Sequence, residues 1–174
     1  MAQIAGGRAN GIAQFGNTPQ AFLGSLAPLI AFPLVGSALL IAGGGSWSIL
    51  LDLLAAFCAL LAPPVLSYEL ARLWSRQAMW PRFATAFNWC QWLLPVLAFA
   101  LLIVLSVLMA AGFPQQAAAP VLVLALAGYG LWLHWFLARH GLNLSWLRAG
   151  VLVVCVNAGT VLLILGPRLI VTEL

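Results

Sequence analysis

The sequence contains very little charge: seven basic and three acidic residues among 174. A water-soluble domain carries about 25% charged residues, whereas only 6% are charged here. So few charged groups could not solvate the surface of a soluble domain, so we expect the solvent to be lipid. The basic residues are all arginines and are scattered singly along the chain. This pattern lacks the basic stripe of nucleic-acid-binding proteins, and no nucleic-acid partner is predicted.

Patterns that support catalysis or metal binding are also absent. The chain has no phosphate-binding glycine loop, HExxH or GxSxG motif. Three acids and two histidines give little capacity for general acid–base catalysis. His134 and His140 are six residues apart and would face different sides of a helix, and Cys58, Cys90 and Cys155 are interpreted as small buried apolar residues. We therefore predict no enzyme activity, no catalytic residue, no cofactor and no metal.

Apolar residues, in contrast, are abundant: 64% of the chain is hydrophobic and the mean hydropathy is +1.09. The apolar runs are continuous over about 20 residues, which suits membrane-spanning helices, whereas barrel strands would alternate apolar and polar residues. The sequence predicts an all-α polytopic transmembrane bundle. Its five spans are expected at residues 21–42, 47–68, 87–112, 120–138 and 149–166. The alternative has four spans, with the first or the fifth run re-entrant.

Proline and the chain ends refine this prediction. Pro28 and Pro33 predict that the first span is kinked or locally broken, and Pro120 is expected to open the fourth span as its first helical residue. Residues 1–20 are predicted to form a flexible cytoplasmic tail without a cleaved signal peptide. Residues 167–174 are predicted to form a short external tail.

Arginine predicts the orientation of the spans. With five spans, one side of the membrane holds six arginines and the other holds only Arg168. The positive-inside bias then places the amino terminus in the cytoplasm and the carboxyl terminus outside, as in a multi-pass protein of a bacterial inner membrane. The six arginines are Arg8, Arg72, Arg76, Arg82, Arg139 and Arg148.

Three of these arginines follow the second span. Glu69, Arg72 and Arg76 are spaced by three and four residues, which places neighbours on one helix face. Together with Arg82, the two arginines would contact anionic lipid headgroups or, alternatively, a cytoplasmic protein partner.

Two isolated polar residues lie inside the predicted spans. Asp52 is five residues beyond Trp47, near the outer interface. It is either a carboxylate favoured by the start of a helix or a ligand for a proton or cation. Asn157 lies near the middle of the fifth span beside small residues, where it either holds helices together or contacts a substrate.

A larger polar and aromatic group is predicted near the inner leaflet. The third span opens with NWCQW and the fourth closes with WLHW, and we expect these spans to be antiparallel neighbours. The group forms either a cavity for a lipid headgroup or small amphiphile, or an interfacial belt with interhelical hydrogen bonds. Its members are Asn88, Trp89, Gln91, Trp92, Trp132, His134 and Trp135.

Two functions follow from these features. The first is a non-enzymatic scaffold or accessory subunit that binds membrane lipids or another membrane protein. The second is a small-molecule transporter or permease subunit that acts as a homo-oligomer. The transport hypothesis depends on Asp52, Asn157 and the prolines Pro28, Pro33 and Pro95, which could free backbone carbonyls toward a cavity.

Two stretches carry a family resemblance: PRFATAFNW at residues 81–89 and LWLHWFLARHGLNLSWLRAGVLV at residues 131–153. With the five-span layout, they resemble the bacterial branch of the Yip (Ypt-interacting protein) family. The resemblance implies a cytoplasmic amino-terminal tail, five helices and a short external tail. The acidic and aromatic tail motif of the eukaryotic members is absent from residues 1–20, so the resemblance does not imply GTPase binding or any functional residue.

Overall fold

The computed structural model describes the backbone of residues 1–44, 46 and 48–171, and side chains as far as residue 164. Trp47, the side chain of Arg168 and the last three residues lie outside this range. Across the described residues the secondary structure is entirely helical. In chain order the elements are α1 (Ala2–Ala5), η1 (Ala9–Gln14), α2 (Pro19–Ala42), α3 (Ser48–Leu73), η2 (Gln77–Met79), α4 (Trp80–Cys90), α5 (Leu93–Ala110), α6 (Gln115–Gly141) and α7 (Trp146–Val171).

Five helical segments are long and apolar enough to cross a membrane, as the sequence predicts. They are Pro19–Ala42, Ser48–Leu73, Gln77–Ala110, Gln115–Gly141 and Trp146–Ile164. In lipid the backbone groups have no water to bond, so long helices that pair their own N–H and C=O groups are the stable form.

Most helices extend beyond the predicted boundaries. α3 continues to Leu73 and α4 begins at Trp80, so much of the expected polar loop is helical. α6 begins at Gln115, which places Pro120 inside the helix and not at its first position. α7 continues past residue 166 into the predicted external tail. Most of the predicted helices were too short because their ends were set where the apolar run stops. A helix can continue past that point into the polar interface.

The prolines act differently from the prediction. α2 is an uninterrupted helix through Pro28 and Pro33, whereas the third span is divided between α4 and α5 at Gln91 and Trp92. Pro95 explains this break, because proline cannot donate to the carbonyl four residues earlier and its ring crowds that carbonyl. That carbonyl belongs to Gln91, which instead accepts from the Leu94 amide at 3.2 Å.

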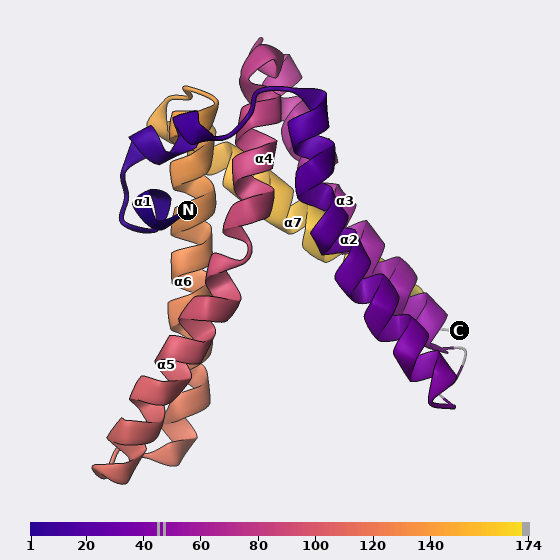
Figure 1. The fold of residues 1–174 in the computed structure, drawn as a ribbon, viewed down its shortest axis with the longest axis vertical. Coiled ribbons are helices and arrows are strands. Elements are labelled where there is room, and N and C mark those ends of the chain that lie inside the picture. The colour runs from indigo at the N-terminus through magenta and orange to yellow at the C-terminus, as the bar shows by residue number, and fades with distance from the viewer. Residues whose placement is uncertain (45, 47, 172–174) are drawn as a thin grey trace.

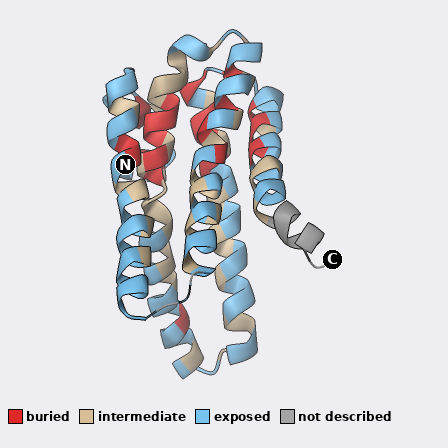
Figure 2. Cartoon of the chain, turned by 90° about the vertical axis from the view of Figure 1, so that its right-hand side faces the viewer, coloured by how far each residue is buried: buried red, intermediate tan, exposed pale blue. Residues whose placement is uncertain are grey.

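The helices form two arms that diverge from one compact end (Figure 1). One arm is the α5–α6 hairpin. The other contains α2 and α3, with α7 packed against α3. Between the arms, α4 packs on both α2 and α6. Buried residues gather at the compact end, and the far half of each arm is mostly exposed (Figure 2). The helix order places the starts of α2, α4 and α7 and the ends of α3 and α6 at the compact end.

The amino-terminal segment, residues 1–17, packs against the compact end instead of forming the free tail that the sequence predicts. Ile4 is fully buried and Ile12 is 4% exposed. The Tyr129 hydroxyl on α6 donates to the Ala5 carbonyl at 3.5 Å. Burial of the two isoleucines explains why a segment rich in polar residues and glycine folds onto the bundle.

Candidate functional site

A cavity of about 380 Å³ lies where α4 ends, at the fork between the two arms. Its polar residues are Asn88 and Gln91. Asn88 is eight residues past Trp80, which is about 12 Å along α4. The helix break at Gln91 turns the chain toward the α5–α6 arm. Beyond this break α4 no longer covers α2 and α3.

The other walls of the cavity are apolar. Leu29 of α2 and Phe87 of α4 contribute to the lining. Four residues of α3 complete it with the spacing of a single helix face: Ala56, Ala59, Leu60 and Pro63. Small side chains at the alanine positions leave the space open.

A buried hydrogen bond positions Asn88. Its side-chain nitrogen donates to the Ser25 hydroxyl on α2 at 2.9 Å, and that hydroxyl donates to the Phe22 carbonyl at 2.6 Å. Ser25 and Asn88 are 1% and 3% exposed. Among the described residues none donates a hydrogen bond to the side-chain oxygen of Asn88, so this Oδ1 atom can accept one from a molecule in the cavity.

Gln91 adds a second uncharged amide to the same cavity. An amide side chain can both donate and accept hydrogen bonds. Apolar walls with a few convergent polar groups are typical of small-molecule sites, which have volumes of about 300–1,000 Å³. The arrangement therefore suits an uncharged amphiphile with a hydroxyl or carbonyl group, such as the glycerol region of a lipid.

His134 and Asn157 meet on the other side of the compact end. The Asn157 side-chain nitrogen on α7 lies 3.2 Å from Nδ1 of His134 on α6, and it donates to the Val153 carbonyl at 2.7 Å. An amide nitrogen only donates, so Nδ1 accepts and the proton of the neutral ring is on Nε2. One amide hydrogen of Asn157 thus bonds to α6 and the other bonds within α7. This agrees with the first of its two predicted roles, in which it holds helices together.

The four predicted tryptophans do not form one aromatic wall. The Trp92 ring packs in a tilted arrangement against that of Phe32 on α2, with ring centroids 5.1 Å apart. Trp132 lies 5.4 Å from Phe136 and faces the amino-terminal segment. Trp135 lines an apolar groove between α6 and α7. Trp89 is partly buried on α4. The sequence predicted that these tryptophans lie at a similar depth in the membrane. It could not predict that they lie on different faces of the bundle.

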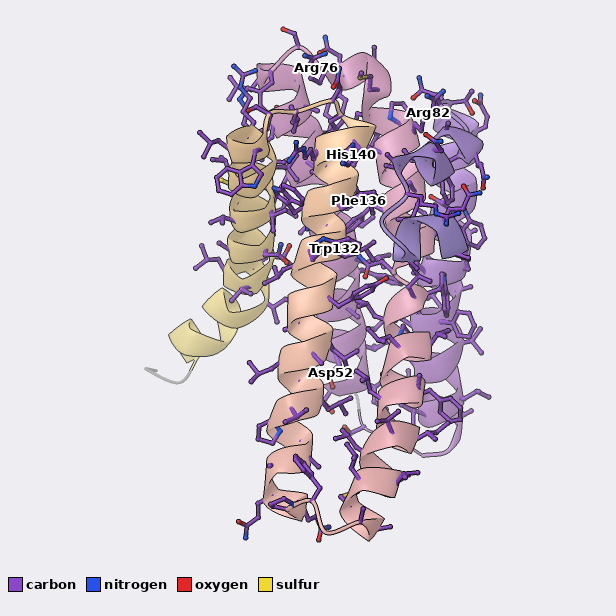
Figure 3. All side chains as sticks on the ribbon, turned by 90° about the vertical axis from the view of Figure 1, so that its left-hand side faces the viewer. Asp52, Arg76, Arg82, Trp132, Phe136 and His140 are labelled. Atoms are coloured by element: carbon purple, nitrogen blue, oxygen red, sulfur yellow. The ribbon has the colours of Figure 1, made fainter. Side chains whose placement is uncertain are left out.

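Asp52 and the arginines lie away from the cavity. Asp52 is exposed on α3, beyond its first turn, and Figure 3 shows it far from the arginine-rich end. Arg72 forms an ion pair with Glu69 at 2.6 Å, as their spacing predicts. Arg76 follows the end of α3, so the prediction that it shares a helix face with Arg72 is wrong. The left-handed φ of 56° at Ser75 turns the chain there.

The structure tests the prediction that the three cysteines are small buried residues. Cys90 is buried as expected, but Cys58 and Cys155 are exposed on faces that lipid would cover. Within the described part of the chain, no three histidine, cysteine or acidic side chains are grouped to hold a metal ion.

Sequence reasoning missed Ser25 and the α3 wall of the cavity. The spacing of residues 56, 59, 60 and 63 places them on one helix face, but they lie in a run that is apolar on every side. The sequence therefore does not distinguish this face from the faces that contact lipid. Ser25 is a small polar residue in such a run and was the available signal for a hydrogen-bonding partner on α2.

Comparison with known proteins finds no protein family, no characterised protein and no solved structure that matches the chain. The resemblance to the Yip family therefore stays a prediction.

Proposed function

We propose that this chain is a non-enzymatic membrane protein that binds a membrane lipid or similar uncharged amphiphile and acts as a lipid-binding scaffold or accessory subunit. The observation that carries the proposal is the cavity at the fork, where Asn88 and Gln91 meet the apolar face of α3. A lipid with its acyl chains between the arms would place its ester or hydroxyl groups beside the two amides.

The same proposal includes an orientation. Six arginines belong to the compact end or to segments adjoining it, and the positive-inside bias places this end in the cytoplasm of a bacterial inner membrane. Asn88 and Gln91 are then about 12 Å and about 16 Å from the cytoplasmic start of α4, on the side of the membrane whose inner leaflet would supply the lipid ester groups.

The residues on which the transport hypothesis depends do not form a common site in the structure. Asp52 and Asn157 do not line the cavity. Asn157 uses both amide hydrogens inside the protein, and α2 keeps its helical form at both prolines.

Native mass spectrometry of the protein, extracted from its own membrane in mild detergent, tests the proposal. We expect the wild-type protein to retain a lipid or small amphiphile. Ala56→Phe should release it, because the ring fills the cavity. Ala127→Phe is the matched control, since Ala127 is also an exposed helical alanine but does not line the cavity. Equal retention by both variants, or none by the wild type, would reject this site.

A further inference from the structure

A second cavity, of about 190 Å³, lies at the compact end between the amino-terminal segment, the start of α4 and the end of α6. Its polar lining residues are Asn17, Arg82 and His140, and Ile12 and Met79 are among its apolar ones. Figure 3 shows Arg82 and His140 at this end of the molecule, on α4 and α6. The volume corresponds to about six water molecules, enough for a phosphate group.

The guanidinium group of Arg82 has a buried nitrogen, Nε, without a hydrogen-bond acceptor in the described structure. A buried donor without an acceptor is unfavourable, and more so when the group is charged. Nε itself is enclosed, whereas Arg82 as a whole is half-buried and lines the cavity. A charged guanidinium without a described acceptor beside a cavity is a group that an anion from outside the chain would stabilise.

The chain itself offers no described carboxylate for this role. Only three acidic residues exist. Glu69 pairs with Arg72 on α3, and Asp52 lies toward the far end of the same helix. Nearby Arg139 lies over the Trp135 ring, 5.2 Å from its centroid, and adds positive potential at this end. The electrostatics of the cavity thus favour an anion.

Asn17 fixes the cavity wall. Its side-chain oxygen accepts from the Arg82 backbone amide at 3.1 Å, and its nitrogen donates to the Ala78 carbonyl at 3.0 Å. The amino-terminal segment is thereby held beside the arginine. His140 is exposed at the edge of the cavity, with its ring 4.7 Å from that of Phe136. Its imidazole is a second group that can hydrogen-bond an oxyanion.

We propose that this cavity binds a phosphate-bearing anion, with Arg82 as its charge partner and His140 as a second hydrogen-bonding group. The guanidinium fork matches phosphate oxygens in geometry and charge. The phosphate belongs either to an anionic phospholipid headgroup or to a small soluble molecule. The site is separate from the cavity at the fork and does not depend on it.

Arginine labelling of the wild-type protein tests the proposal without any substitution. Phenylglyoxal modifies accessible guanidinium groups, and peptide mass spectrometry reads each arginine separately. The protein is labelled in uncharged maltoside micelles, in the same micelles with phosphatidylglycerol, and with inorganic phosphate at constant ionic strength. Arg148 is the internal control, because it is exposed at the same end and lies outside the cavity.

We expect labelling of Arg82, but not of Arg148, to slow by at least about fivefold when the site is occupied. Slowing by phosphatidylglycerol alone identifies a lipid headgroup, and slowing by inorganic phosphate identifies a soluble ligand. No protection of Arg82, or equal protection of both arginines, would overturn the proposal, since equal protection indicates only diffuse surface attraction.

Variants provide the second measurement. Arg82→Gln should weaken binding of the protecting anion by at least about tenfold, the loss expected for a charge-assisted hydrogen bond. Arg148→Gln should change it by no more than about twofold. Ala56→Phe, which fills the cavity at the fork, should leave it unchanged. Equal losses in Arg82→Gln and Arg148→Gln would contradict a specific site.

Discussion

The side-chain nitrogen of Asn157 on α7 lies 3.2 Å from Nδ1 of His134 on α6. His134 is 5% exposed, and its ring also packs against Phe87, with centroids 4.6 Å apart. This hydrogen bond is a polar connection between two helices that cross at the compact end.

A double-mutant cycle measures the strength of that connection. The single variants Asn157→Ala and His134→Phe should each lower the free energy of unfolding, and together they should lose less than the sum. The coupling energy should be about 0.6 kcal/mol, with about 1.7 kcal/mol as the upper end for interhelical hydrogen bonds in membranes. Reversible unfolding in mixed micelles gives the four values. Strict additivity would show that the bond contributes nothing.

Gly159 provides a test of the α3–α7 contact. A Cβ atom at Gly159 would lie 2.6 Å from Cδ1 of Leu66 on α3, whereas one at Gly150 would meet no heavy atom within 4 Å. Gly159→Leu should therefore destabilise the protein by about 1–3 kcal/mol through overpacking. Gly150→Leu, on the same helix, should be close to neutral.

The destabilised Gly159→Leu protein should recover part of its stability when Leu66→Ala is added, because the smaller side chain restores the space. Thermal unfolding in a fixed detergent compares the variants. An equal effect at both glycines, or no recovery with Leu66→Ala, would contradict close packing of α7 on α3 at this position.

The folded amino-terminal segment predicts protection from protease. Ile4→Asp should release the segment, because a carboxylate cannot be buried at a fully buried position without a large cost. Trypsin should then cleave after Arg8 at least about tenfold faster than in the wild type, as local opening governs the rate. Ala2→Asp is the control, since Ala2 is exposed on the same helix. Rapid cleavage of the wild type at Arg8 would show that the segment is not packed.

The proposed orientation can be tested with fusions to a reporter that is active only outside the cytoplasm. A fusion after Gln77, at the compact end, should be silent. A fusion after Gly112, in the turn between α5 and α6 at the far end, should be active. The reverse pattern would place the arginine-rich end outside and contradict the proposed orientation.

The sequence by itself determined that the chain is helical and has five segments able to span a membrane. Runs of about 20 apolar residues leave the backbone no partner but itself, so this result needs no knowledge of packing. The spacing of Glu69 and Arg72 also predicted their contact, because the interaction is local to one helix.

Only the tertiary structure decided which helix faces meet. The spans are apolar on nearly every side, and lipid is as apolar as leucine, so no periodicity marks the inner face of such a helix. For this reason the sequence identified Asn88, Gln91, His134 and Asn157 as notable but could not pair Asn88 with Ser25 or His134 with Asn157. The divergence of the arms and the Arg82 cavity likewise depend on long-range packing, which brings together residues as distant as Asn17 and His140.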